Sequence, residues 1–124
     1  MDIAPKTTKA LRAYVLAYPA VLPLAFFLTW VTGRLSLGYW PRPSLDDPKD
    51  IAWLDIPYVT TGILLVVGLP IFLVANVGIL QLAFINQRQR WRLIPVSILS
   101  LGLMAGSIAL IRWDPLDVVT WYMD

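Results

Sequence analysis

Long apolar stretches alternate with shorter charged segments along this chain. Three stretches hold no charged side chain, at about 13–33, 58–85 and 93–111, and charged segments separate them. A charge at the centre of a bilayer is costly, and a helix of about 20 apolar residues crosses its core. Each stretch is long enough to cross once and too short to cross twice. The pattern therefore predicts an all-α integral membrane protein, with three transmembrane helices in a single membrane domain, 1–124.

The second stretch is longer than one crossing needs. At 1.5 Å per residue its 28 residues reach roughly 42 Å, beyond a hydrocarbon core of about 30 Å. Pro70 lies inside it and lacks a backbone N–H, which predicts a kink. Asn76 follows six residues later, where an unpaired amide would cost free energy in hydrocarbon. We therefore expect Asn76 to face another helix or the carbonyl freed by the proline.

The third stretch carries a small-residue pattern typical of helix packing in membranes. Gly102 and Gly106 are four residues apart, with Ala109 nearby, so they form a flat strip on one helix face. Such a strip lets a second backbone approach closely. The spacing fits packing within the chain and contact with a partner equally well, and both interpretations stay open.

The charged segments predict the orientation. Six basic residues and one acid precede the first stretch or lie in the turn 86–92, whereas four basic residues and seven acids lie in the loop 34–57 and the tail 112–124. Cytoplasmic segments carry the excess of Lys and Arg. We therefore expect a multi-pass protein of a bacterial inner (plasma) membrane, with its N-terminus in the cytoplasm and its C-terminus outside, periplasmic or extracellular. The six basic residues are Lys6, Lys9, Arg12, Arg88, Arg90 and Arg92.

Two similar strings lie in the outer segments. Asp47 and Asp114 are each followed by Pro and, three residues on, by a second Asp. Asp at the N-cap and Pro at the first helical position are typical helix starts. They predict two short interfacial helices on the outer face, lying at the membrane surface. The alternative interpretation is a docking face for an outside partner, formed by Trp40, Trp53, Trp121, Asp47 and Asp114.

Composition limits the chemistry that the chain can perform. It is 58% hydrophobic and 15% charged, and it holds no His, Cys or Glu, which excludes thiolate catalysis, disulfides and the usual zinc and haem ligands. The string 46–50 matches the DDxxD spacing by which prenyl-diphosphate enzymes hold magnesium, but proline interrupts it in a short loop, where capping explains the Asp residues. We expect no catalytic, cofactor or metal site.

Elimination leaves a non-catalytic function. We expect a small accessory or scaffolding subunit of a larger bacterial membrane complex, with other membrane subunits and lipids as partners and no nucleic acid. One alternative is a minimal transporter or pore formed by several copies of the chain, although the three stretches hold no ionisable side chain. A third hypothesis is a magnesium-dependent enzyme acting on a lipid diphosphate.

Overall fold

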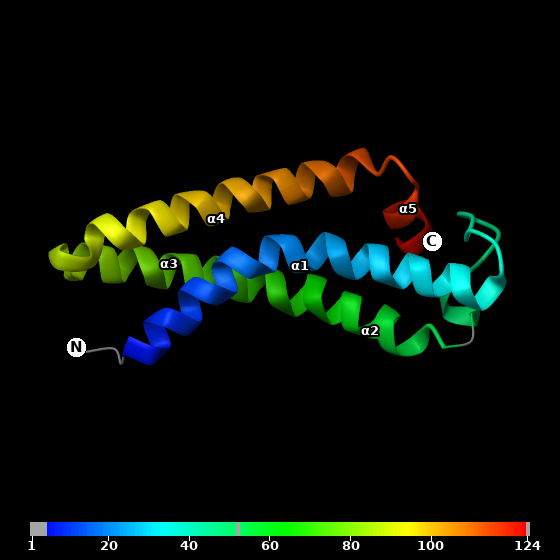
Figure 1. The fold of residues 1–124 in the computed structure, drawn as a ribbon, viewed down its shortest axis with the longest axis horizontal. Helices are drawn as coiled ribbons and strands as arrows, with labels where there is room; N and C mark the ends of the chain where they lie inside the picture. Colours follow the sequence, from blue (N-terminus) through cyan, green and yellow to red (C-terminus); the bar gives the residue numbers. More distant parts are fainter. Residues whose placement is uncertain (1–4, 52, 124) are drawn as a thin grey trace.

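The computed structural model describes residues 5–51 and 53–123, and the regular structure of these residues is helical. Three long helical rods lie side by side (Figure 1). In chain order the elements are α1 (Pro5–Leu37), the 3-10 helix η1 (Pro48–Asp50), α2 (Asp55–Ile63), the π-helix η2 (Leu64–Gly68), α3 (Leu69–Ile85), α4 (Gln87–Trp113) and α5 (Val118–Met123). Elements α2, η2 and α3 follow one another without a break and form the second rod.

The prediction of an all-helical fold with three helices long and apolar enough to cross a membrane is confirmed. The helices extend beyond the charge-free stretches, because the backbone hydrogen bonds of a helix form with charged and apolar side chains alike. The third rod, for example, begins at Gln87 and holds Arg88, Arg90 and Arg92 in its first two turns.

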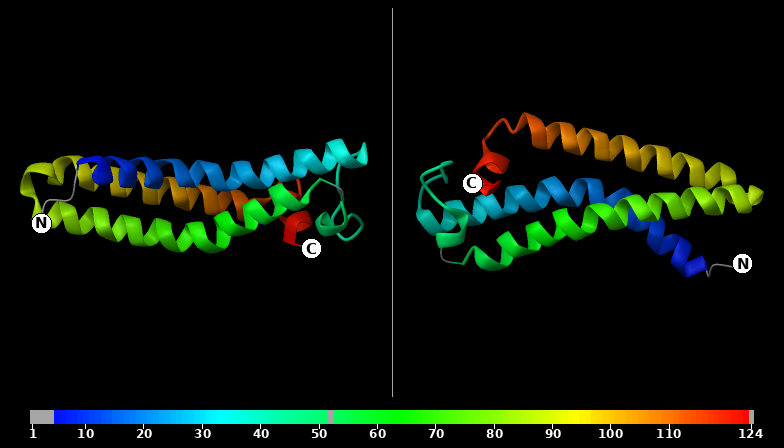
Figure 2. Two further views of the ribbon diagram at one scale, coloured as in Figure 1. Left: turned by 90° about the horizontal axis from the view of Figure 1, so that it is seen from below. Right: turned by 180° about the vertical axis from the view of Figure 1, so that it is seen from behind.

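The chain runs along the bundle three times and gives it two different ends (Figures 1 and 2). We call the end with the start of α1 and the α3–α4 turn the turn end, and the end with residues 38–51, 53–54 and α5 the loop end. Helix α1 packs against α2, α3 and α4, while α3 also packs against α4. After α4, the chain folds back so that α5 lies against α1.

The buried core follows one face of α1. Its residues recur at three- and four-residue spacing, as expected for one face of a helix. They include Val15, Tyr18, Leu22 and Phe26, which pack with Phe72, Ile79 and Leu93 of the other rods. The outer faces are apolar as well, with Val66 and Val74 both 71% exposed. Exposed apolar area of this extent is unusual for a protein in water and normal for one in lipid.

Helix α1 bends at its internal prolines. Pro19 and Pro23 lie inside it, and proline both removes a helical hydrogen bond and clashes with the preceding turn. Figure 1 shows the first turns of α1 slanting away from α3 and α4, whereas its second half runs along α2. The turn end is consequently more open than the middle of the bundle.

A π-helical stretch precedes Pro70 in the second rod, where the sequence predicted a kink. The five residues of η2, Leu64–Gly68, form a π-helical stretch directly before the turn that holds Pro70. A π-helix uses i→i+5 hydrogen bonds and is wider than an α-helix. The rod therefore continues through the proline, but the carbonyls of the widened stretch are open to partners on other helices.

Candidate functional site

Asn76 joins α3 to α4 by hydrogen bonds that are wholly buried. Its Oδ1 accepts from the hydroxyls of Ser97 at 2.9 Å and Ser100 at 2.8 Å, and its Nδ2 donates to the Phe72 carbonyl at 3.1 Å. The Ser100 hydroxyl lies 2.9 Å from the Ser97 carbonyl as well. The amide oxygen thus faces α4, whereas the amide nitrogen binds the Phe72 carbonyl of its own helix and not the Val66 carbonyl four residues before Pro70.

Two tyrosines of α1 bind the carbonyls of the π-helix. The Tyr18 hydroxyl donates to the Leu64 carbonyl at 2.6 Å, and the Tyr14 hydroxyl donates to the Gly68 carbonyl at 2.7 Å. The two acceptors are the first and last residues of η2. These groups lie in helices that are long and apolar enough to cross a membrane, and inside a bilayer they would have no water as an alternative partner. We call Tyr14, Tyr18 and Gly68 the tyrosine clamp.

Gly68 lets the clamp close. A Cβ at this position would lie 2.6 Å from Cε2 of Tyr18, well inside van der Waals contact. The Tyr18 ring has little room to move, because it stacks between the rings of Tyr14 and Phe72. The distances between the ring centroids are 5.6 Å and 5.5 Å. The clamp was not predicted from the sequence. Its available signal was two tyrosines inside a predicted span, where a hydroxyl needs a partner.

A threonine pair joins α1 to α2 closer to the loop end. The hydroxyls of Thr29 and Thr61 lie 3.0 Å apart and are both buried. Each hydroxyl also lies 2.8 Å from the carbonyl four residues before it, Ala25 for Thr29 and Pro57 for Thr61, so one threonine donates to the other while the second donates to its carbonyl. The second rod is therefore held at three levels, by the threonine pair, the tyrosine clamp and Asn76.

Most buried polar side chains of the bundle are satisfied by these contacts. Among the described residues, the buried side-chain atoms without a partner are Trp30 Nε1 and Ser107 Oγ. Polar groups that bond to each other across helix interfaces stabilise packing.

Helix α4 has one face toward the bundle and an opposite face that is free. Gly102, Gly106 and Ala109 are exposed, and a Cβ built on either glycine would meet no atom within 4 Å. At 3.6 residues per turn, these three positions lie opposite the buried face. The glycine strip therefore does not pack internally, which removes one of the two interpretations of this spacing. The buried residues of α4 are Leu93, Ser97, Ser100, Met104 and Ser107.

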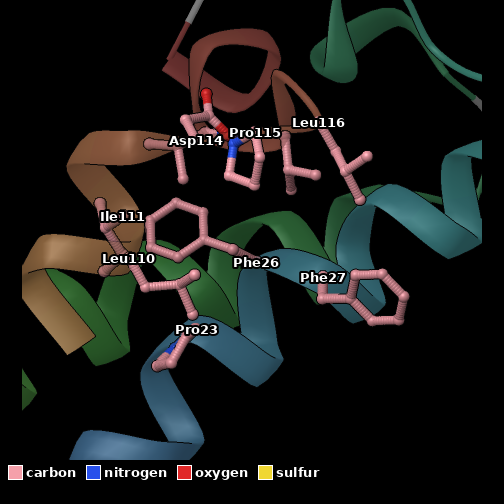
Figure 3. Close-up of a pocket in the computed structure, with 10 residues that line it drawn as sticks. Pro23, Phe26, Phe27, Leu110, Ile111, Asp114, Pro115 and Leu116 are labelled. Atoms are coloured by element: carbon pink, nitrogen blue, oxygen red, sulfur yellow. The ribbon is translucent and has the colours of Figure 1, made fainter. Parts of the chain in front are cut away.

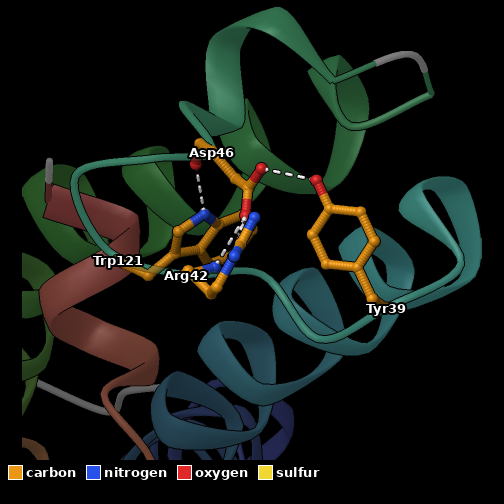
Figure 4. A network of polar contacts seen from close by, with 4 residues as sticks. All are labelled: Tyr39, Arg42, Asp46 and Trp121. Atoms are coloured by element: carbon orange, nitrogen blue, oxygen red, sulfur yellow. Dashed lines mark hydrogen bonds and ion pairs between the residues drawn. The ribbon is translucent and has the colours of Figure 1, made fainter.

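Asp46 organises the loop end (Figure 4). Its carboxylate accepts from the Tyr39 hydroxyl at 2.8 Å and from the Arg42 backbone N–H at 3.0 Å, while its own carbonyl accepts from Trp121 Nε1 at 2.6 Å. Partial burial raises the pKa of Asp46, but the bonds from Tyr39 and Arg42 outweigh it and bring the pKa below its ordinary value. The contact with Trp121 ties the loop to α5 across 75 residues of sequence.

Asp114 ends α4 and caps α5. Its backbone is left-handed, with φ of 39°, and its carboxylate accepts from the backbone N–H of Val119 at 3.0 Å and of Thr120 at 2.7 Å. Burial alone would raise the pKa of Asp114. These hydrogen bonds, together with the one from the Thr120 hydroxyl, lower the pKa by more, so it lies below its ordinary value. The expected start at Pro115 is wrong, because a turn intervenes and α5 begins at Val118. Asp47 caps η1 through the Lys49 N–H at 2.9 Å.

Tyr122 fixes α5 on the second rod. Its hydroxyl donates to the Tyr58 carbonyl at 2.7 Å, and its ring meets Phe26 edge to face at 4.8 Å. Burial, with a smaller contribution from the Tyr58 phenol, raises the pKa of Tyr122 to about 12. The hydroxyl is therefore protonated at ordinary pH and available as a donor.

A small apolar pocket lies beneath the α4–α5 turn (Figure 3). Its volume is about 130 Å³, and Pro23 and Phe26 of α1 face Leu110 and Pro115 across it. Asp114 also borders it, but its carboxylate is occupied in capping α5. The pocket offers hydrophobic contact and no free catalytic group.

The five residues of the expected docking face do not share one surface. Trp53 is 88% exposed and has a left-handed backbone, with φ of 70°. Trp40 is 50% exposed and stacks on Trp30 at 4.3 Å. Trp121 is fully buried, which corrects its place in a docking face, since its indole N–H is needed inside to bond the loop. As described above, Asp47 and Asp114 act as caps.

The DDxxD-like string is divided among different structural tasks. Asp46 binds Tyr39 and Arg42, and Asp47 caps η1, while Asp50 is exposed. In the part of the chain that the structure describes, no group of three or more His, Cys, Asp or Glu side chains is placed to hold a metal ion. The geometry of the string therefore agrees with the capping and loop interpretation.

Comparison with known proteins adds no further constraint, since no family model, curated protein or solved structure matches the chain. Any function must be argued from the geometry above.

Proposed function

We propose that the chain crosses a bacterial plasma membrane three times and acts as a small, non-catalytic accessory subunit that packs against other membrane proteins. The turn end carries Lys6, Lys9, Arg12, Arg88, Arg90 and Arg92, so the positive-inside rule assigns it to the cytoplasm. The loop end, with α5 and Asp46, then lies outside.

The observation that carries the proposal is the free face of α4. Gly102 and Gly106 lie opposite the serines that face the bundle, and the space around both is open. In lipid, helices associate through close backbone approach and not through a hydrophobic driving force. A partner helix crossing at this strip gains contact that lipid chains provide poorly. The bundle does not need the strip for its own packing, because Asn76 and the serines already hold α4.

A second contact is proposed at the loop end, through Trp40 and Trp53. Both indoles are largely exposed, and aromatic residues are enriched in protein interfaces as well as at membrane surfaces. A partner subunit that covers the loop end would bury Trp53 in particular. Trp53→Ala then weakens the complex, whereas an indole that merely anchors the chain in the interface leaves the complex intact.

The test is co-purification from the native membrane in mild detergent. Gly102→Ile and Gly106→Ile each add bulk to the strip, and Gly78→Ile is the matched control, since a Cβ there also meets open space but lies on α3. We expect all three variants to insert, and only the α4 variants to lose larger, unlike partners.

Two results would contradict the proposal. A wild-type chain that purifies only with copies of itself favours the homo-oligomeric alternative. Retention of every partner by both α4 variants removes the strip from the function.

A further inference from the structure

The turn end holds a cleft between the first turns of α1 and of α4. It has a volume of about 550 Å³ and is lined in roughly equal parts by polar and apolar surface. Figure 2 shows the start of α1 diverging from the other rods, and this helix holds Pro19 and Pro23 inside it. The cleft is thus a product of the fold and lies away from the glycine strip.

The mouth of the cleft is basic. Lys9 and Arg12 border it from α1 and Arg92 borders it from α4. None of the described residues that line it is acidic, and the ion pair that the described residues form, Arg42 with Asp46, lies at the other end of the bundle. Three cations therefore face one space without a counter-charge from the described chain.

The α1 wall changes from charged to apolar along the bundle axis. On α1, Lys9 is followed one turn on by Ala13 and two turns on by Leu16, which lie on the same face. On α4, the neutral Gln89 comes first, and Arg92 follows about one turn on, next to the buried Leu93. The chemistry along this axis is that of an amphiphile, with an anion at one end and hydrocarbon at the other.

We propose that this cleft binds the headgroup of an anionic glycerophospholipid. The phosphate lies among Lys9, Arg12 and Arg92, whose positive charges attract it and whose N–H groups form charge-assisted hydrogen bonds with its oxygens. Thr8 and Gln89 also line the mouth and offer neutral hydrogen-bond donors to the headgroup. The acyl chains run along Ala13, Leu16 and Leu93 toward the bilayer. Basic pockets between helices at the cytoplasmic side are the setting in which such headgroups bind.

The apolar walls favour a lipid over a free phosphate ion, because an ion gains nothing from Leu16 and Leu93. The inference shares with the proposed function only the membrane crossing and its orientation. It does not depend on the α4 strip, so loss of lipid binding and loss of partners are separate results.

The test compares phosphatidylglycerol with phosphatidylcholine of the same acyl chains, presented in equal amounts to the purified full chain in detergent. Native mass spectrometry counts the lipids that stay bound. The cleft variant carries Lys9→Gln, Arg12→Gln and Arg92→Gln. The matched control carries Lys6→Gln, Arg88→Gln and Arg90→Gln, which removes the same charge from the same end but from residues that do not line the cleft.

We expect the wild type and the control to prefer phosphatidylglycerol and the cleft variant to lose that preference. A basic residue near an anionic surface changes affinity by about fivefold, so three changes amount to roughly 100-fold. An equal loss of the preference for phosphatidylglycerol in the cleft variant and in the control would overturn the site, because the general positive charge of the turn end would then explain the binding. Absence of any preference in the wild type overturns it outright, as does displacement of the lipid by inorganic phosphate at millimolar concentration.

A folding defect is distinguished by a conservative variant. Arg12→Lys with Arg92→Lys keeps the positive charges at the mouth and is expected to retain most of the preference, even if the triple glutamine variant fails to fold. If this variant folds, as judged by circular dichroism, and still loses all preference for phosphatidylglycerol, charge at the mouth does not explain binding and the proposal is wrong.

Discussion

Gly68→Ala tests whether the tyrosine clamp holds the bundle together. The new methyl group would lie 2.6 Å from Cε2 and 3.1 Å from Cζ of Tyr18. The ring is only 2% exposed and is stacked on both sides, so it cannot turn away without breaking its hydrogen bond to Leu64. The substitution therefore either pushes the Tyr18 ring away from the second rod or breaks the hydrogen bond between the Tyr18 hydroxyl and the Leu64 carbonyl.

The magnitude follows from three contributions. Overpacking a close contact costs about 1–3 kcal/mol. Losing the Tyr18 hydrogen bond adds about 0.6–1.7 kcal/mol, the measured range for such bonds between helices in a membrane protein. Replacing glycine by alanine inside a helix returns roughly 0.5–1 kcal/mol. The free energy of unfolding should thus fall by about 1–4 kcal/mol.

Gly78→Ala is the control within the same rod. A Cβ at Gly78 meets no atom within 4 Å, so this variant receives the helical gain without the overlap and is expected to be as stable as the wild type or slightly more so. Tyr18→Phe isolates the hydroxyl, since it keeps the ring, and should lower the free energy of unfolding by about 0.6–1.7 kcal/mol.

The assay is reversible unfolding of the purified chain by a denaturing detergent in mixed micelles, followed by far-UV circular dichroism. A double-mutant cycle with Tyr18→Leu completes it, because leucine lacks Cε2, Cζ and the hydroxyl that the new methyl would meet. In that background Gly68→Ala should cost little, giving a coupling energy of about 0.5–3 kcal/mol. Equal stability of the Gly68 and Gly78 variants, or a coupling near zero, refutes the clamp.

Three further predictions concern the other contacts. Asn76→Ala removes the acceptor shared by Ser97 and Ser100 and should lower the free energy of unfolding by about 1–3 kcal/mol in the same titration, whereas Gln81→Ala, an exposed polar residue of α3, should leave it nearly unchanged. The pKa of Asp114 lies below its ordinary value of 3.8 in the folded chain. Its contribution to the free energy of unfolding is therefore complete above pH 3.8 and is lost as pH falls through the lower folded pKa. The free energies of unfolding at about pH 6 and about pH 3 should differ less in Asp114→Asn than in the wild type. A reporter fused at the C-terminus should read outside and one inserted at 86–92 should read inside; a cytoplasmic C-terminus contradicts the three-span topology.

The features that sequence reasoning predicted are those set by large local costs. A charge in hydrocarbon is expensive wherever it lies, so charge-free stretches located the three rods. An unpaired amide is expensive as well, so Asn76 was expected to face another helix or the carbonyl freed by Pro70, and its amide oxygen binds Ser97 of α4. Both arguments need only one residue and its depth along a helix.

The features that it missed depend on which residues meet in three dimensions. Tyr14 and Gly68 are 54 residues apart, and nothing in either neighbourhood specifies the other. The side of α4 that packs is set by Ser97 and Ser100 because they meet Asn76, and this left the glycines free. Trp121 was expected on the surface because exposed and buried indoles look alike in a sequence. Only the fold of the loop around Asp46 places its N–H inside.

The distribution of polar groups on α4 bears on the homo-oligomeric alternative. A pore made from several copies needs a polar surface facing the common axis to replace the water around a solute. The polar residues in the middle of α4 are serines, and Ser97 and Ser100 are bound to Asn76 inside their own chain. The face left for other copies consists of glycine, alanine and large apolar residues such as Ile98, which is 65% exposed.

A ring of such faces encloses an apolar path, which closes to water by dewetting. The same face suits a helix of another protein well, because close packing there needs no polar group. The α4 surface is therefore better suited to a subunit contact than to conduction.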